Sequence, residues 1–510
     1  MKCRRGPARR PKTPRECLGW RSAQPSRTGR DQVPDARAHA PRSATLGELR
    51  ADGYPDRTVK QEIAANAASR LRAGDELVTG LVGFDDTVLP AVETALLAGH
   101  DLILLGERGQ AKSRILRALP ELLDDAIPVV AGSEVHDHPY HPFSPGARAL
   151  VADHGDDTPI EWIGREARFA EKLATPDIAV ADLIGDVDPI KVAEGRYLGD
   201  EGTIHFGLLP RHNRGIVAIN ELPDLAERIQ VALLNVMEER DVQVRGYSLR
   251  LPLDLLVVAT ANPEDYTNRG RIITPLKDRF GSEVRTHYPT RLEDEVAVMA
   301  QEAVLPGGSV DVAVPPHLSE VLAAFTRALR SASEVNQRSG VSVRFSTASY
   351  ETLAASALRR ALRVGEEPAV ARPVDLAQVL AAGLGKIEFE TYEEGREIEV
   401  LERLLRRALL EVFRRRTAGV DLSALVERFE AGAVVETSDT LAGADLLGQL
   451  SGDETGPAVP GLGRLLAALD VAEESPALAA SALEFALEGL HLSRRIDRTD
   501  LGDGVVRYGA

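Results

Sequence analysis

The stretch from Asp101 to Ser113, DLILLGERGQAKS, constrains the fold more than any other part of this chain. The apolar run Leu102 to Leu105 predicts a short buried strand, and a helix is expected to begin near Lys112. The loop between them differs at one position from the pattern G-x-x-x-x-G-K-[ST], because Ala111 stands where the pattern has its second glycine. A strand, a loop and a helix in this order are typical of a polyphosphate site.

The spacing within the loop indicates what each part of it would contact. Backbone N–H groups wrap the phosphates, Lys112 meets the outer phosphates, and the hydroxyl of Ser113 holds Mg²⁺. We therefore expect a nucleoside triphosphate and Mg²⁺ as ligands. The residues expected to bind the nucleotide are Gly106, Glu107, Arg108, Gly109, Gln110, Ala111, Lys112 and Ser113.

A second buried strand is expected over Ile216 to Ile219, a continuous apolar run of the kind found in parallel sheets covered on both faces. It ends in Asn220 and Glu221. Triphosphatases usually end this strand with an acid for the Mg²⁺ shell and a carboxylate that polarises the attacking water. Glu221 fits the second role, at the tip of a strand expected to lie beside the strand that feeds the loop.

Asn220 is a departure in the first role, because its amide carries no charge. Opposite unit charges 4 Å apart attract by about 4 kcal/mol at an effective dielectric of 20. We still assign Asn220 to the metal site together with Ser113, since the amide oxygen can accept from a metal-bound water, and we expect weakened Mg²⁺ binding.

Further candidates follow in chain order. A third buried strand, Leu255 to Thr260, precedes Asn262, which can contact the terminal phosphate or orient the water. Arg344 stands just before a predicted helix, from which it can reach back over the nucleotide. Three arginines are candidates for a cation that reaches a neighbouring subunit's nucleotide, or are surface charges: Arg269, Arg271 and Arg279.

The distribution of charge along the chain indicates which classes of binding partner to expect. The net charge is −17, yet residues 1–45 carry 12 Lys/Arg against 3 Asp/Glu, so the body of the chain is more acidic than the total. An acidic body argues against nucleic acid as the main ligand. No apolar run approaches the roughly 18 residues that span a bilayer, and no secretory signal is visible, so we expect a cytoplasmic protein without membrane insertion.

The pattern of segments predicts an α/β core followed by helices. We expect a disordered basic tail (1–45), an α/β nucleotide-binding core (46–289), a helical lid domain (290–395) and a C-terminal helical region (396–510). Residues of about 131–212 are polar and rich in Pro and Gly, and we interpret them as an insertion between two sheet strands. The histidines in it, His136, His138 and His141, fit a solvated loop better than a metal site.

Several of these stretches resemble one known family. GERGQAKS resembles the loop of MoxR proteins, in which alanine before lysine is usual, and FGLLPRHNRG resembles a segment of the magnesium-chelatase ATPase subunit. ALLNVMEERDVQVRGYSLRLP resembles the MoxR helix and inserted hairpin, while TANP and LKDRF resemble both. Over residues of about 75–365 the chain thus resembles AAA+ ATPases of the MoxR and magnesium-chelatase ATPase-subunit group.

The resemblance implies a fold, ligands and residue roles. The fold would be a P-loop NTPase core, with a parallel five-stranded sheet and helices on both faces, followed by a helical lid. ATP and Mg²⁺ would be the cofactors. Glu221 would be the catalytic base, Asn262 the first sensor, Arg279 the arginine finger and Arg344 the second sensor. Such proteins form homo-oligomeric rings, commonly hexamers, and their usual partner has a von Willebrand factor A domain.

Four functions remain open at this level. The leading hypothesis is an ATP-hydrolysing motor that remodels a partner protein. The second is the ATPase subunit of a magnesium chelatase in tetrapyrrole synthesis. The third is a nucleotide-gated scaffold that hydrolyses little because Asn220 weakens the metal site. The fourth, a transcriptional activator, is weakly supported because neither a GAFTGA-like loop nor a basic helix-turn-helix is visible.

Overall fold

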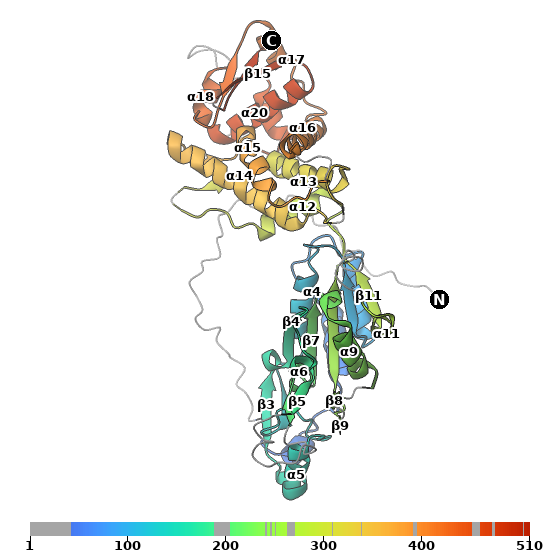
Figure 1. Ribbon diagram of the computed structural model, residues 1–510. Helices are drawn as coiled ribbons and strands as arrows, with labels where there is room; N and C mark the ends of the chain where they lie inside the picture. The colour runs from blue at the N-terminus through green and yellow to red at the C-terminus, as the bar shows by residue number, and fades with distance from the viewer. Residues whose placement is uncertain are drawn as a thin grey trace, which may run out of the picture.

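The computed structural model of the 510-residue chain consists of an α/β body and a mainly helical body (Figure 1). It describes residues 42–187, 204–239, 242–244, 247–249, 251–262, 271–308, 310–337, 339–390, 395–450, 459–471, 475–502 and 504–509. Arg269 and most of the basic tail lie outside these ranges.

The α/β body is built on the predicted five-stranded parallel sheet, in the order β11-β1-β10-β7-β4. Its strands are β1 (Leu102–Leu105), β4 (Phe169–Leu173), β7 (Gly215–Asn220), β10 (Leu255–Ala261) and β11 (Ser282–Arg285). Alternate residues of the three central strands point to opposite faces. One face therefore packs Ile103, Val217 and Val257 into one hydrophobic cluster. The other packs their neighbours, such as Leu104 and Val258, into a second.

Helices cover both faces, as the sequence predicts. On one face lie α2 (Val59–Ala73), α3 (Val88–Leu97) and α4 (Lys112–Ala118), and on the other α9 (Glu227–Glu239) and α11 (Thr274–Arg279). The remaining elements of this body, besides short 3₁₀ turns, are α1 (Leu46–Ala51), β2 (Ala126–Val130), α5 (Pro145–His154), β3 (Ile160–Gly164), α6 (Val180–Leu183), β5 (Gly185–Val187), β6 (Ile204–Phe206), α8 (Leu208–Arg211), β8 (Val242–Val244) and β9 (Tyr247–Leu249). The last two form the antiparallel hairpin that the family resemblance implied.

The sheet corrects two expectations. Strand β10 lies between β1 and β7, so the strand that ends at Asn220 is not beside the strand that feeds the loop. Strand β4, which falls inside the predicted insertion of 131–212, is one of the two edge strands of the central sheet. Its sequence, FAEKL, is only partly buried because an edge strand has a single neighbour, so it lacks the apolar run that marks the central strands.

A buried ion pair holds the start of β4 against the sheet. The Arg168 side chain is fully buried and donates to both carboxylate oxygens of Glu62 on α2, at 2.8 and 2.6 Å, and to the carbonyl oxygen of Arg214 at 2.8 Å. A buried guanidinium needs such partners because its charge is otherwise costly to desolvate. The pair ties the polar segment before β4 to the core.

The second body contains α12 (Leu292–Glu302), α13 (Pro316–Ser331), α14 (Val343–Val364), α15 (Leu376–Gly383), α16 (Glu397–Arg416), α17 (Ser423–Glu430), α18 (Gly443–Gly448), α19 (Leu462–Ala468) and α20 (Pro476–Leu492). The short strands β12 (Val312–Ala313) and β13 (Ala369–Val370) pair in parallel. One hydrophobic cluster runs from Leu292 to Tyr508. The lid and the C-terminal region therefore share a core across the boundary predicted at 395.

The C-terminal region also contains an antiparallel sheet that the sequence did not predict. Strands β14 (Val435–Thr437), β16 (Val505–Gly509) and β15 (Asp497–Gly502) pair in that order. They are short, and the exposed β15 has the polar sequence DRTDLG, so no alternating apolar pattern marks it.

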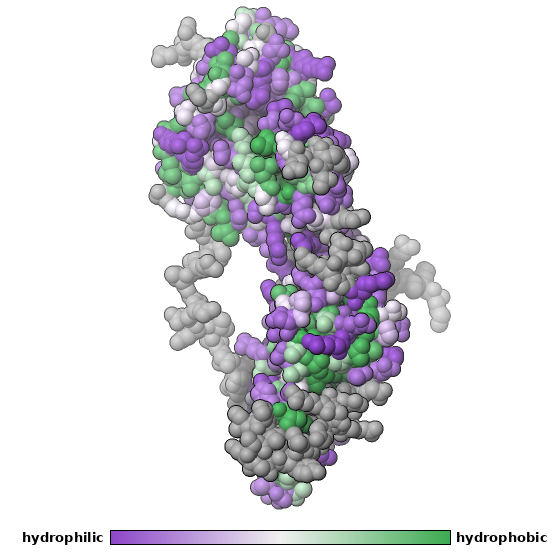
Figure 2. Space-filling view, in the orientation of Figure 1, coloured by the Kyte–Doolittle hydropathy of each residue, from purple (hydrophilic) through white to green (hydrophobic). Residues whose placement is uncertain are grey.

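Hydrophilic residues cover most of the visible face of the helical body, whereas a hydrophobic patch lies on the α/β body over α9 and α11 (Figure 2). Among the described residues, no helix is long and apolar enough to cross a membrane.

Candidate nucleotide-binding site

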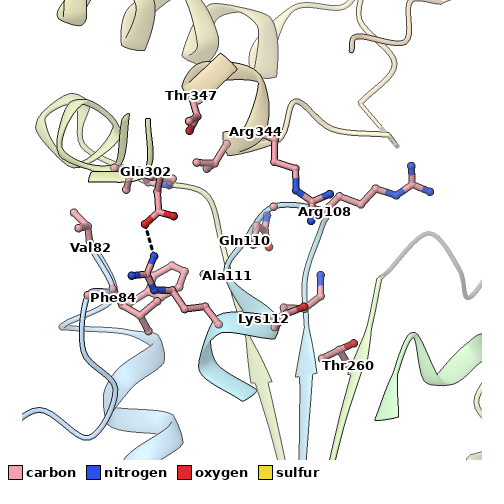
Figure 3. Close-up of a pocket in the computed structure, with 18 of the residues that line it drawn as sticks. Val82, Phe84, Arg108, Gln110, Ala111, Lys112, Thr260, Glu302, Arg344 and Thr347 are labelled. Atoms are coloured by element: carbon pink, nitrogen blue, oxygen red, sulfur yellow. Dashed lines mark hydrogen bonds and ion pairs between the residues drawn. The ribbon is translucent and has the colours of Figure 1, made fainter. Parts of the chain in front are cut away.

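A cavity of about 860 Å³ lies between the α/β body and the lid (Figure 3). It opens at the carboxyl ends of the parallel strands, which is where open α/β sheets bind ligands. The loop lines it from Arg108 to Ser113, the tips of β7 and β10 contribute Asn220, Glu221, Thr260 and Asn262, and the lid adds Arg344. This volume is within the range of small-molecule pockets. Residues that are distant in sequence thus meet in one cavity.

The loop needs small residues at particular places. A Cβ at Gly106 would stand 1.9 Å from Thr286 Oγ1 and 2.3 Å from Gln110 Oε1, so only glycine fits there. Gly109 has φ 78°, and Ala111 also has a positive φ of 56°. An alanine can occupy this left-handed region at a cost of about 1–2 kcal/mol. The loop therefore keeps the backbone form of the glycine pattern although Ala111 replaces its second glycine.

The side chain of Gln110 braces the loop from within. Its Oε1 accepts from the backbone N–H of Glu107 at 2.9 Å and from Thr286 Oγ1 at 3.0 Å. Tyr288 donates its hydroxyl to the carbonyl oxygen of Arg108 at 2.9 Å. These contacts hold the loop in place through one of its backbone N–H groups and one of its carbonyl groups, and the loop lines the cavity from Arg108 to Ser113.

Lys112 joins the loop to the neighbouring strand tip. Its buried ammonium donates to Asn262 Oδ1 at 2.8 Å, to the carbonyl oxygen of Glu107 at 2.7 Å and to that of Gly106. The side chains that the sequence assigned to the outer phosphates and to the first sensor are thus in direct contact. Because β10 lies next to β1, its tip places Asn262 between the loop and Glu221.

A hydrogen-bonded chain crosses the strand tips. The backbone N–H of Glu221, which has φ 56°, donates to Thr260 Oγ1 at 3.0 Å, and Thr260 Oγ1 donates to Asn220 Oδ1 at 3.3 Å. Asn220 Nδ2 in turn donates to Glu171 Oε1 at 2.6 Å. Among the residues that the structure describes, none donates to the Glu221 carboxylate, which lines the cavity. A carboxylate in this position can accept a proton from water.

The oxygen donors around the loop fit Mg²⁺, which prefers hydroxyl, carboxylate and water oxygens. Ser113, Asn220 and Glu221 all line the cavity. The amide of Asn220, however, is engaged on both sides by Thr260 and Glu171. The carboxylate that contacts Asn220, at the position expected of the first acid, is that of Glu171 on β4.

The predicted arginines are placed differently from one another. Arg344, in the first turn of α14, lines the cavity and extends from the lid towards the loop (Figure 3). Arg279, at the end of α11, is not a lining residue and ion-pairs with Glu238 on α9. Arg271 is exposed and its backbone oxygen accepts from Gln230 at 3.1 Å. Arg269 lies outside the described residues.

The sequence did not single out the apolar end of the cavity. Val82 and Phe84 precede α3 and line the cavity (Figure 3). Val298 of α12 lines it as well. Beside them, Arg114 on the helix after the loop pairs with Glu302 on α12. Such an end suits a flat heterocyclic base. No local pattern marked Val82 or Phe84, because their shared surface exists only once the lid is in place.

The three histidines of the loop after β2 lie apart from this cavity. His138 and His141 both face Asp56, with His141 Nε2 at 2.7 Å from a carboxylate oxygen. Burial lowers the pKa of His138 to about 3. His138 is thus largely buried rather than solvated, because the loop folds back on the segment before α2.

Comparison with known proteins covers part of the chain. Residues 165–281 match the family described as "ATPase family associated with various cellular activities (AAA)", a range that holds β4, β7, β10 and the residues Asn220, Glu221, Asn262 and Arg279 but not the loop. The magnesium-chelatase 38 kDa subunit of Cereibacter sphaeroides is 30% identical over 236 residues, 44% of this chain and 62% of that protein. The magnesium-chelatase subunit ChlI of Anabaena variabilis is 31% identical over 193 residues, 36% of this chain and 52% of that protein.

These matches therefore span 62% and 52% of the lengths of the two relatives. A solved structure of the complex between subunits BchI and BchD of magnesium chelatase shares 20% identity and a TM-score of 0.33, over 64% of this chain and 98% of that one; a likeness this low supports no conclusion. The order of strands in the sheet and the sequence of the loop are consistent with these sequence matches. Residues 165–281 are thus similar to the AAA ATPase family, and part of the chain is similar to magnesium-chelatase subunits.

Proposed function

We propose that this chain binds ATP with Mg²⁺ and hydrolyses it to drive a change in a partner protein. The observation that carries the proposal is that Lys112, Asn262 and Glu221, from three separate segments, line one cavity under Arg344. Phosphoryl transfer to water needs little covalent help from the protein, so positioned charges and a base are sufficient machinery.

Each residue has a distinct part in this proposal. The loop N–H groups hold the phosphates, and Lys112 leaves Asn262 to meet the outer phosphates. Glu221 accepts the proton of the attacking water, and Asn262 orients that water or the terminal phosphate. Bound Mg²⁺ would neutralise phosphate charge at Ser113 and Asn220. Arg344 adds positive charge from the lid, so nucleotide binding would draw the lid and the α/β body together.

The position of Arg279 supports assembly into a ring. It lies outside its own cavity, and its side chain is 41% exposed beside Glu238. An arginine finger acts on the nucleotide of the neighbouring subunit, so its exclusion from the cavity of its own chain is what this role requires. We extend the proposal to a ring, a hexamer as in the resembling family, with a von Willebrand factor A domain protein as partner in the cytoplasm.

A second candidate function is supported by the similarity of this chain to magnesium-chelatase subunits. In this function the same motor would drive Mg²⁺ insertion into a porphyrin. Reconstitution separates the two candidates. The chelatase function predicts that this chain replaces a chelatase ATPase subunit in porphyrin metallation, whereas the remodelling motor predicts no metallation.

Nucleotide binding is the direct test of the proposed function. Titration of the full chain with fluorescent ATP, with and without Mg²⁺, should give saturable binding that Lys112→Ala abolishes. Lys386→Ala, an exposed lysine of the second body, is the matched control and should bind as the native chain does. Circular dichroism checks that both variants fold. Native binding by Lys112→Ala, or no binding by the native chain, would refute the proposal.

A further inference from the structure

Glu171 is the carboxylate that contacts Asn220, the residue at the position expected of the first acid. It lies on β4, next to β7, and its side chain is 21% exposed. Its Oε1 accepts from Asn220 Nδ2 at 2.6 Å. This residue falls within the polar segment of about 131–212 that is predicted to be an insertion, so no role was expected for it.

The same carboxylate is held from the other side by the helix that follows the loop. Arg117 on α4 donates to Glu171 through Nε at 2.8 Å and through a terminal nitrogen at 2.9 Å. Arg117 stands one helical turn after Ser113, and both line the cavity. Glu171 therefore has a fixed position between the residue that ends β7 and the helix that carries the metal-binding hydroxyl.

This arrangement explains the amide at position 220. An aspartate there would bring two carboxylate oxygens to within the 2.6 Å that separates Asn220 Nδ2 from Glu171 Oε1. Like charges so close disfavour each other's ionised form. Asparagine instead donates a hydrogen bond to the neighbouring acid. The negative charge missing from the end of β7 is thus present one side chain away, on the adjacent strand.

We propose that Glu171 supplies, with Asn220 as its hydrogen-bonded partner, the negative charge that the Mg²⁺ site of the nucleotide needs. Glu171 is a positioning residue in this account, and the inference rests on the proposed function. It weakens the reason to expect a scaffold that hydrolyses little, because a carboxylate, although paired with Arg117, stays beside Asn220. Outer partners of metal ligands typically change metal affinity by about 10–100-fold when they are removed.

A charge swap tests the inference. In Glu171→Gln the charge is lost, while in the double variant Glu171→Gln/Asn220→Asp the same hydrogen bond remains with donor and acceptor exchanged. Mg²⁺ is titrated into the chain with fluorescent ADP, and the affinity for ADP is measured at each Mg²⁺ concentration. The measured quantity is the Mg²⁺ concentration at which half of the increase in ADP affinity is reached, and a sample with EDTA is the metal-free reference. We expect this concentration to rise about 10-fold or more in Glu171→Gln and to return to within about 3-fold of native in the double variant.

Two further variants complete the experiment. Asn220→Asp alone should show no gain in Mg²⁺ affinity, because it pairs two acids. Arg117→Gln leaves Glu171 charged and should not weaken Mg²⁺ binding. If Arg117→Gln reproduces the loss of Glu171→Gln, the pair is merely structural and the inference is wrong.

The inference also fails if Glu171→Gln reaches half-saturation at the native Mg²⁺ concentration. It fails as well if the double variant does not return towards that concentration, or if Asn220→Asp alone binds Mg²⁺ more tightly than the native chain. A native chain that binds no nucleotide in either condition refutes the proposed function itself, so the two failures are distinguishable. Metal-free ADP affinity should be equal in all variants, which reports that each has folded.

Discussion

At the scale of single residues, the loop from Gly106 to Ser113 was predictable because its chemistry is local. A strand, a glycine, a lysine and a serine within a few positions define it, and Ala111 keeps the left-handed backbone of the glycine it replaces. Glu171 could not be found in this way. Its significance depends on contacts with Asn220 and Arg117, which come from other strands and helices.

Gly106→Ala gives a prediction at this scale. The added methyl would overlap Thr286 Oγ1 and Gln110 Oε1, at 1.9 and 2.3 Å, and so displace the side chain that braces the loop. We expect a loss of ATP affinity of at least about 10-fold and a destabilisation of about 1–3 kcal/mol, measured by nucleotide titration and urea unfolding. The control is Gly146→Ala in α5, where a Cβ meets nothing within 4 Å. Equal behaviour of the two variants would contradict the prediction.

At the scale of elements, the strands that are buried on both faces could be predicted from the sequence, and the exposed strands could not. The central strands β1, β7 and β10 are covered on both faces and read as apolar runs, so their positions were correctly predicted. The edge strand β4 and the strands of the C-terminal sheet are exposed on one side or more, and they were missed. Strand order was also beyond prediction, because no local pattern says that β10 inserts between β1 and β7.

The contact between α13 and α20 gives a prediction about pH. His317 is fully buried, with Nε2 3.1 Å from Ser481 Oγ and its ring 4.8 Å from that of Phe485. Burial, with Arg416 nearby, lowers its pKa from 6.5 to about 3. Below pH 6.5 the unfolded chain therefore binds a proton that the folded chain does not. His317 therefore lowers the free energy of unfolding by up to about 1.4 kcal/mol for each pH unit as the pH falls from 6.5 towards 3.

His317→Leu should remove this acid sensitivity. Its free energy of unfolding relative to native should improve steadily as the pH falls from 6.5 to 4.5, as measured by urea unfolding across that range. The exposed His154→Gln is the control and should keep the native pH dependence. A stability difference between His317→Leu and native that is constant with pH would show that His317 does not contribute in this way.

At the scale of the whole molecule, the lid depends on the C-terminal region. One hydrophobic cluster includes Leu322 of α13, Leu405 of α16 and Phe485 of α20. The fully buried Arg372 also donates to the carboxylate of Glu484 at 2.8 Å. The sequence predicted helices on both sides of residue 395 but could not show that their apolar faces meet, since such pairing is a long-range property.

Truncation after Glu390 is therefore expected to disrupt the lid rather than release a folded domain. The apolar faces of α13 and α15 would lose their cover, and Arg344 would no longer be held over the cavity. We expect aggregation or binding of a hydrophobic dye, together with ATP affinity reduced by about 10-fold or more. A truncated chain that stays monodisperse and keeps native ATP affinity would show that the two regions fold independently.

The central claim is that Glu221 prepares water to attack a triphosphate held by the loop, and Glu221→Gln tests it most directly. The measurement compares Mg–ATP affinity with steady-state hydrolysis in the full chain and in this variant. We predict unchanged affinity, within about 3-fold, and hydrolysis reduced by about 10²–10⁴-fold, the usual contribution of a general base. Hydrolysis at the native rate by Glu221→Gln would contradict the account.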